Sequence, residues 1–174
     1  MATSDGEKIL TFGFNTAHDL YEKLKRDAIK LKDNPRSKDE CFNFILTAWH
    51  LHHDWMKNDK GVSSLARKKH ENSELAMKFM MHALEVVANS SKHVRVRNNQ
   101  NVKDTKFGEV LNWYGYFYGD FPTIITETAE YPLWKLQEIL IEYYEWVFDE
   151  KITDVALKPN ILTELKKCNL QSQD

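Results

Sequence analysis

FNFILTAWHLHHDW, residues 42–55, is the stretch that decides the fold of this chain. Apolar side chains occupy most of the circumference of a helix drawn through it. The remaining polar stripe consists of Asn43, Thr47, His50 and Asp54, at successive spacings of four, three and four residues. A helix of this kind is buried on most sides. The stretch therefore predicts the central helix of a mainly α protein.

The polar stripe has two interpretations that the sequence leaves open. A carboxylate four residues after a histidine holds its tautomer and makes it more basic, so His50 and Asp54 are candidate catalytic residues. Alternatively, the two side chains satisfy each other on a partly exposed face. His52 points into the apolar arc and is interpreted as a packing histidine.

Composition indicates one ordinary globular domain over residues 1–174, with 42% hydrophobic and 29% charged residues. The net charge of −2 excludes a global attraction to nucleic acid, so such binding needs a local patch. Cys41 and Cys168 are single and far apart, which is typical of a reducing compartment. No apolar run spans a bilayer and no signal-peptide core is present, so we expect a cytoplasmic protein without membrane contact.

Periodicity predicts a bundle of four to five helices. They are expected over residues 16–33, 37–57, 73–92 and 132–149, with a short final helix over 157–170. Ser37 and Glu40 form a capping-box signature at the start of the second helix. The basic residues 62–72 are expected as a loop or a short turn of helix, and residues 171–174 as a frayed tail.

The third helix carries a second polar line. Its core-facing residues are expected to be Leu75, Phe79, Ala83, Val86 and Val87, joined by Met77, Met80, Met81, Leu84 and Ala88. His82, Asn89 and His93 repeat the seven-and-four spacing of Asn43, His50 and Asp54, which predicts that the two helices can converge on one cleft. Lys92, Arg95 and Arg97 add charge suited to phosphate or carboxylate. The same NSSKH segment is also ordinary helix-termination chemistry, and this alternative stays open.

Residues 94–128 predict a small antiparallel β-hairpin element of two or three strands. HVRVRN (93–98) alternates apolar and charged residues, and PTIITET (122–128) is rich in β-branched ones. The aromatic stretch at 110–119 holds more aromatic rings than a thin hairpin buries, so it is a candidate interface. The interface residues singled out are Trp113, Tyr116 and Tyr118.

Cofactor motifs are missing from the sequence. It has no HExxH, close CxxC pair, phosphate loop, dinucleotide fingerprint or GxSxG elbow. We therefore expect no cofactor and no metal site. His50, Asp54 and His93 are the residues whose chemistry would suit zinc if a metal did bind.

AWHLHHDW (48–55), ANSSKH (88–93), the aromatic hairpin and EYYEWVF (142–148) resemble a family of small uncharacterised bacterial helical proteins. The resemblance covers about residues 39–148. It implies a helical bundle with a hairpin insertion and carries no assigned activity.

More distantly, the chain is similar to HEPN domains, whose ribonuclease motif is an Arg, a polar residue and a His a few residues on. Asn89 and His93 match that motif, whereas Ala88 stands where the Arg is expected. The similarity implies a homodimer acting on or binding RNA, in a toxin-antitoxin or phage-defence setting.

If the chain is an enzyme, the similarity implies a metal-independent ribonuclease with His93 as general acid/base. Asn89 and Lys92 would then position the phosphate, and His50 with Asp54 would assist. Arg95, Arg97, Asn43 and His82 are the expected substrate-binding residues. The alternative is a non-catalytic interaction module or a subunit of a larger complex, with a partner protein bound through the aromatic hairpin.

Overall fold

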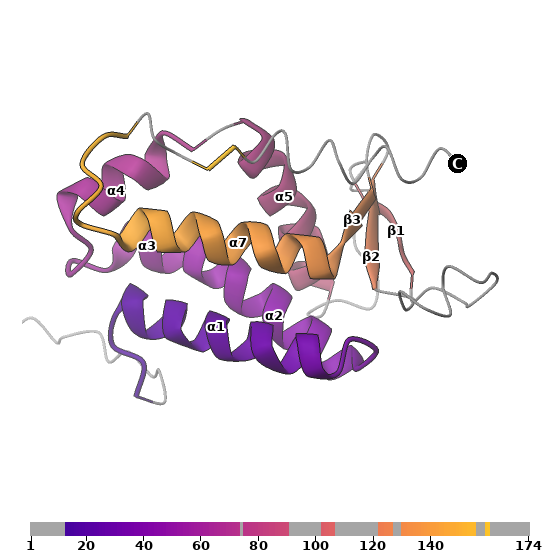
Figure 1. Ribbon diagram of the computed structural model, residues 1–174. Helices are drawn as coiled ribbons and strands as arrows, with labels where there is room; N and C mark the ends of the chain where they lie inside the picture. Colours follow the sequence, from indigo (N-terminus) through magenta and orange to yellow (C-terminus); the bar gives the residue numbers. More distant parts are fainter. Residues whose placement is uncertain are drawn as a thin grey trace, which may run out of the picture.

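The computed structural model describes residues 13–73, 75–90, 102–106, 122–126, 130–155 and 159–160. Helices predominate in them, and a small antiparallel sheet stands at one end (Figure 1). The helices are α1 (Ala17–Asp33), α2 (Lys38–His50), the π-helical segment η1 (Leu51–Trp55), α3 (Met56–Asn58), α4 (Ser64–Glu71), α5 (Leu75–Ser90) and α7 (Leu133–Phe148). The strands are β1 (Val102–Lys106), β2 (Thr123–Thr126) and β3 (Glu130–Pro132). The predicted fold class, mainly α with a small antiparallel β element, is confirmed.

Short polar side chains begin the first two helices, and the one at Ser37 was predicted from the sequence. The Thr16 hydroxyl accepts from the Asp19 amide, and the Asp19 carboxylate accepts from the Thr16 amide, each at 3.0 Å. Ser37 accepts from the Glu40 amide at 3.2 Å. The reciprocal half of that second capping box is replaced, because the Ser37 amide donates to the Asn34 carbonyl at 3.0 Å instead of to Glu40.

The central helix forms as expected, but it contains a π-turn that the sequence did not predict. α2, η1 and α3 follow one another without a break from residue 38 to residue 58. In an α-helix the Met56 amide would donate to the carbonyl of His52, whereas here it reaches back to the carbonyl of Leu51. π-turns of this kind rotate the side chains that follow them and are frequent at functional sites.

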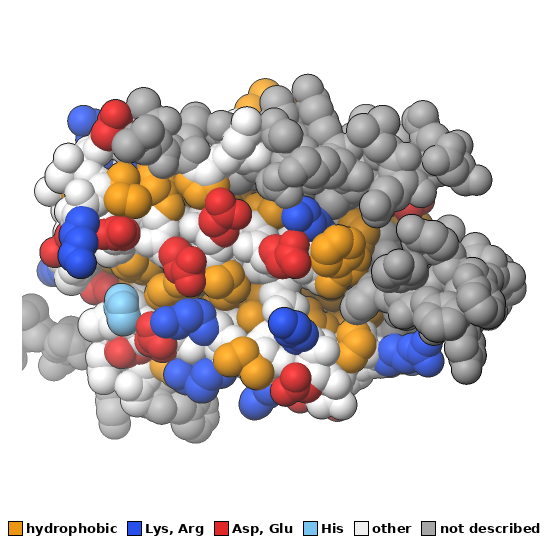
Figure 2. Space-filling view, in the orientation of Figure 1, with side chains coloured by type: hydrophobic (Ala, Val, Ile, Leu, Met, Phe, Trp, Pro, Cys, Tyr) orange, Lys and Arg blue, Asp and Glu red, His pale blue; other side chains and the backbone are white. Residues whose placement is uncertain are grey.

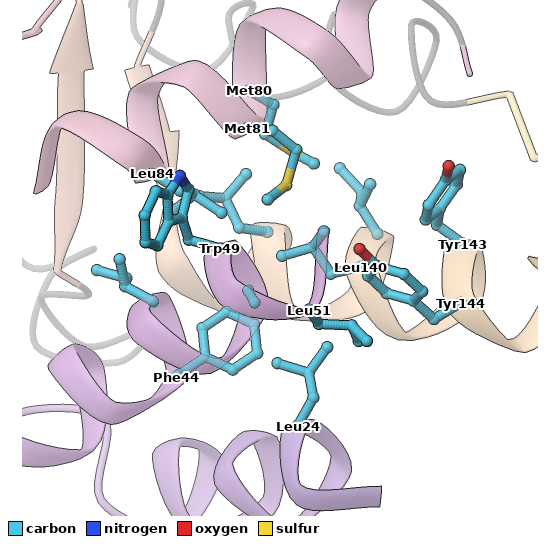
Figure 3. Close-up of a cluster of buried hydrophobic side chains, with 14 of the residues drawn as sticks. Leu24, Phe44, Trp49, Leu51, Met80, Met81, Leu84, Leu140, Tyr143 and Tyr144 are labelled. Carbon is cyan, nitrogen blue, oxygen red and sulfur yellow. The ribbon is translucent and has the colours of Figure 1, made fainter. Parts of the chain in front are cut away.

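The core lies around α2 and η1, which contact both α1 and α5. Trp49 lies beside Leu84 of α5, while Leu51 points toward Leu140 and Tyr144 of α7 (Figure 3). The side chains that are most completely buried include Phe44, Leu24, Leu51, Met56, Met77, Met80, Leu84, Leu136, Tyr143 and Tyr144. The buried face of α5 is therefore the methionine side, which meets α2.

That packing corrects the expected orientation of α5. Leu75 and Phe79, predicted to face the core, are 66% and 62% exposed, whereas Met77 and Leu84 are fully buried. The helix is apolar around most of its circumference, so periodicity alone did not determine which arc meets α2. The resulting surface pair of Leu75 and Phe79, one turn apart, is called the α5 apolar pair below.

The sheet has the strand order β1-β2-β3 and is antiparallel throughout. Ile124 of β2 lies opposite Tyr131 of β3, and both side chains are buried. β3 leads directly into α7, where the Leu133 amide donates to the Pro122 carbonyl at 2.8 Å. β2 confirms the strand predicted at 122–128, while the expected strands at 93–98 and 110–119 lie outside the described residues.

The basic stretch 62–72 contains a regular helix, α4, rather than a loop or a single turn. Ser63 caps it by accepting from the Ala66 amide at 3.2 Å. Pro159 and Asn160 are not helical, and the rest of the expected final helix lies outside the described residues. Within the described part of the chain, no helix combines the length and the hydropathy needed to cross a bilayer.

Candidate functional site

The buried part of the polar stripe joins two helices. Thr47 donates to Asp27 of α1 at 2.7 Å and accepts from the Lys23 ammonium at 2.6 Å, and Lys23 also bonds Asp27. Thr47 and Asp27 are both buried. This part of the stripe therefore ties α2 to α1.

The outer part of the stripe forms the predicted histidine–carboxylate pair. His50 Nδ1 lies 2.9 Å from Asp54 Oδ2, and the two side chains are 39% and 44% exposed. Asn43 is exposed farther along the same face. The carboxylate orients the imidazole as a general base requires, but so exposed a pair is also the ordinary surface contact of the second interpretation.

The second polar line does not join the stripe among the described residues. His82 Nδ1 pairs with Glu85 of its own helix at 3.1 Å, and Asn89 is half-buried. No hydrogen bond or ion pair links these described α5 side chains to His50 or Asp54. The reason is rotational, because Trp49 is the side of α2 beside α5 (Figure 3), while Thr47, about 200° away, faces α1.

Several predicted site residues lie outside the described part of the chain, so their arrangement stays a prediction. They are Lys92, His93, Arg95, Arg97, Trp113, Tyr116 and Tyr118. Ala88, which stands where the HEPN motif has Arg, is described and is 1% exposed in the core. An arginine at this position would enter the core.

A pocket of about 430 Å³ lies where the π-turn meets α4 and the start of α5, and is called the histidine pocket below. Its lining residues are His52, Met56, Lys57, Arg67, His70, Glu71, Ser73 and Lys78. Four successive elements of the chain, η1, α3, α4 and α5, thus contribute to one largely polar concave surface.

The two histidines of the pocket are fixed by hydrogen bonds. His70 Nε2 lies 3.1 Å from the carbonyl of His52, and since a carbonyl only accepts, this nitrogen carries the proton. In neutral His70, Nδ1 then accepts from the Tyr143 hydroxyl at 3.2 Å. His52 Nδ1 lies 3.3 Å from the Tyr144 hydroxyl, and the two imidazole rings meet edge to face at 4.3 Å.

The π-turn gives the His52 carbonyl its place in this network. The Met56 amide, which would occupy that carbonyl in an α-helix, bonds the Leu51 carbonyl instead. The His52 carbonyl therefore receives the His70 imidazole. A local irregularity of the central helix and a histidine of α4 are thus parts of one arrangement.

Burial keeps both imidazoles neutral at neutral pH. Desolvation lowers the pKa of His52 to about 3, with positive charge on Lys57 and Lys78 acting in the same direction. Desolvation also lowers the pKa of His70 to about 4. Both imidazoles can therefore form hydrogen bonds with a ligand at pH 7, but neither is in the protonated form that a general acid requires.

Fixed charge gives the histidine pocket a positive character. Lys57, Arg67 and Lys78 face one carboxylate, that of Glu71. The Arg67 guanidinium is held by the carbonyls of Met56, Lys57 and Asp59 at 3.1, 2.7 and 2.9 Å. By contrast, the face formed by α1 and α7 mixes acidic and basic side chains (Figure 2). An anionic ligand is therefore better matched to the pocket than to that face.

Sequence reasoning missed this pocket for identifiable reasons. It interpreted His52 as a packing histidine, which its bond to Tyr144 supports, and it assigned His70 to a solvated basic run. His70 is 18 residues from His52 and 73 from Tyr143, so no local spacing joins them. The available signal was weak, namely two histidines beside lysines in helical segments.

Metal chemistry gains no support from the described residues, in which no group of three His, Cys, Asp or Glu side chains could hold an ion. Comparison with protein-family models, with curated proteins and with solved structures gave no match to this chain.

Proposed function

We propose that this chain is a HEPN-like helical protein that binds RNA, and that the histidine pocket receives one of its phosphates. The observation that carries the proposal is the charge of the pocket, three cations against one carboxylate. Phosphate contacts supply most of the sequence-independent affinity for nucleic acid. With a net charge of −2, the chain needs a local patch of this kind.

The proposal is binding rather than cleavage at this pocket. Metal-independent cleavage by two histidines needs one of them protonated, and burial lowers the pKa values of His52 and His70 to about 3 and 4. The core position of Ala88 also argues against the HEPN cleavage motif. We further propose a toxin-antitoxin or phage-defence setting, in keeping with the HEPN resemblance, and a cytoplasmic location, which the buried free thiol of Cys41 supports.

Binding of a fluorescent single-stranded RNA, followed by anisotropy over a salt series, tests the proposal. The variant Lys57→Ala/Lys78→Ala should bind about tenfold more weakly, and the slope of log affinity against log salt should fall by about one per lost contact. Lys30→Ala/Lys32→Ala on α1 is the control, because it removes the same charge from exposed lysines outside the pocket. Equal weakening in both variants, or no binding by the wild type, would contradict the proposal.

The ribonuclease form of the HEPN hypothesis has a separate test. Purified protein is incubated with tRNA, and we expect the RNA to stay intact. Cleavage that disappears in His93→Ala would instead support a catalytic role for His93, with Asn89 and Lys92 positioning the phosphate.

A protein-interaction module is the second candidate function, and the α5 apolar pair favours it. Leu75 and Phe79 expose most of their side chains on neighbouring turns of one helix. The partner we propose is a second copy of this chain, in keeping with the homodimer that the HEPN resemblance implies. Two such faces can meet around a twofold axis.

Mass measurement by light scattering at increasing protein concentration tests the second candidate. Wild type should reach the dimer mass, and Leu75→Ser/Phe79→Ser should remain a monomer with unchanged thermal stability, because both side chains are exposed. Ile29→Ser on α1, which removes another exposed apolar side chain, is the control. A wild type that stays monomeric at high concentration would rule this candidate out.

A further inference from the structure

α4 is attached to the rest of the protein differently from the other long helices. Its buried residues are Ala66, Lys69 and His70, so only a single methyl group is a buried apolar side chain. α5 and α7, by comparison, bury rows of large apolar side chains. α4 also lies at the end of the molecule opposite the sheet (Figure 1).

Polar side chains replace the missing apolar contacts of α4. Arg67 donates to carbonyls at the end of α3, and Lys69 donates to the carbonyls of Trp146 and Asp149 at 2.7 Å each. His70 donates to the carbonyl of His52 and accepts from the Tyr143 hydroxyl. Segments held by few apolar contacts are the ones that open locally while the rest stays folded.

Among these attachments His70 is the imidazole, the side chain whose ordinary pKa of about 6.5 lies next to mildly acidic pH. A proton on His70 would be buried, and its Nδ1 would become a donor facing the Tyr143 hydroxyl, which also bonds Ser73.

The charged and titratable groups around the two histidines, taken together, disfavour a further positive charge there. These groups are His53 of η1, Lys57 of α3, Arg67 and Glu71 of α4, Lys78 of α5, and Tyr143 and Tyr144 of α7. The three cations outnumber the single carboxylate, and burial keeps the two tyrosines uncharged. The docked position of α4 is therefore specific for neutral histidines.

We propose that α4 is an acid-released wall of the histidine pocket, docked while His70 is neutral and undocked, with the other helices still folded, when His70 takes up a proton. This goes beyond the proposed function, because the release needs no RNA. Releasing α4 removes Arg67, His70 and Glu71 from the pocket and so dismantles it.

Linkage gives the size of the effect. With a pKa of about 4 when docked and about 6.5 when released, His70 shifts the opening equilibrium of α4 by about tenfold between pH 7.5 and 5.5. The direction is toward opening as the pH falls, since the released state binds more protons.

Native-state hydrogen exchange of the full chain without RNA tests the proposal. After correction for the intrinsic pH dependence of exchange, the amides of α4 should lose about tenfold in protection between pH 7.5 and 5.5, and at each pH they should be less protected than those of α1, which open only with the whole molecule. Equal protection of α4 at both pH values would overturn the proposal, as would protection of α4 as high as that of α1, since α4 would then open only by global unfolding.

His70→Gln removes the titrating group and keeps one donor and one acceptor, so the pH dependence of α4 exchange should disappear. His82→Gln is the matched control, since His82 is a partly exposed histidine on α5. If His70→Gln undocks α4 at every pH, Tyr143→Phe decides, because losing the hydroxyl that donates to Nδ1 should raise the pKa of docked His70 toward its released value and so reduce the loss of α4 protection between pH 7.5 and 4.5. An undiminished loss in Tyr143→Phe, or a persisting tenfold loss in His70→Gln, would overturn the proposal.

Discussion

The residues of the polar stripe lie on one face of the central helix, but their environments differ. Thr47 is 4% exposed and bridges Lys23 and Asp27 of α1, whereas Asn43, one turn earlier, is exposed. The hydroxyl matters because the carboxylate it bonds is itself buried. A buried charged group that loses one of its partners pays for desolvation without compensation.

Replacing Thr47 by Val should therefore lower the free energy of unfolding by about 1–3 kcal/mol, since the shape is kept and the hydrogen bonds to Asp27 and Lys23 are lost. Urea denaturation followed by circular dichroism measures the change. Asn43→Ala, on the exposed part of the same stripe, should stay within about 0.5 kcal/mol. Equal effects of the two substitutions would mean that the buried cluster adds nothing.

Among the helices, α4 shows that a run of basic residues can be largely buried or hydrogen-bonded within the protein. Of RKKH at 67–70, Lys69 and His70 are buried, Arg67 binds carbonyls of the preceding turn, and Lys68 is exposed. Lys69 ends at the carboxyl terminus of α7, where a cation complements both the unpaired carbonyls and the helix dipole. Most residues of this basic run thus attach α4 to the neighbouring helices.

Lys69→Met keeps the aliphatic stem but leaves the carbonyls of Trp146 and Asp149 without that donor. We expect it to lower the free energy of unfolding by about 1–3 kcal/mol. Lys68→Met removes the same charge one residue earlier and should change it by less than about 0.5 kcal/mol. Thermal or urea unfolding of both variants makes the comparison, and a Lys69→Met protein as stable as Lys68→Met would be the contrary result.

The whole molecule should be sensitive to acid because the folded protein keeps its histidine pair neutral, with His70 buried and His52 half-buried. Between the folded pKa values, about 3 for His52 and about 4 for His70, and the unfolded value near 6.5, the unfolded chain binds more protons. The free energy of unfolding therefore falls as the pH falls below about 6.5. Asp19, whose pKa is lowered by hydrogen bonds to Asn15 and Thr16, acts only below its ordinary value of 3.8.

Urea denaturation at pH 7.5, 6.5, 5.5 and 4.5 should show this loss, with a slope approaching about 1.4 kcal/mol per pH unit for each buried histidine. His70→Gln should reduce the slope, and His82→Gln should not. A stability that is constant from pH 7.5 to 4.5 would show that the two histidines titrate alike in the folded and the unfolded protein.

Helix positions could be predicted from local chemistry, but much of the candidate site could not. Ser37 caps the second helix where expected, because capping depends on residues within one turn, whereas the cap at Thr16 was not predicted. The exposed Phe79 was mispredicted, because α5 is apolar on more than one side and only contact with α2 selects between them. The π-turn was missed because a single inserted residue leaves no trace in helical periodicity.

The sequence by itself determined that this protein is mainly helical, that residues 42–55 lie in its centre, and that His50 and Asp54 pair. These follow from side chains a few residues apart on one helix, whose mutual position the helix geometry fixes. Only the tertiary structure decided that Thr47 faces α1 and that His52, His70 and Tyr143 meet in one network. Such residues are far apart along the chain, so their meeting depends on how whole helices pack and rotate.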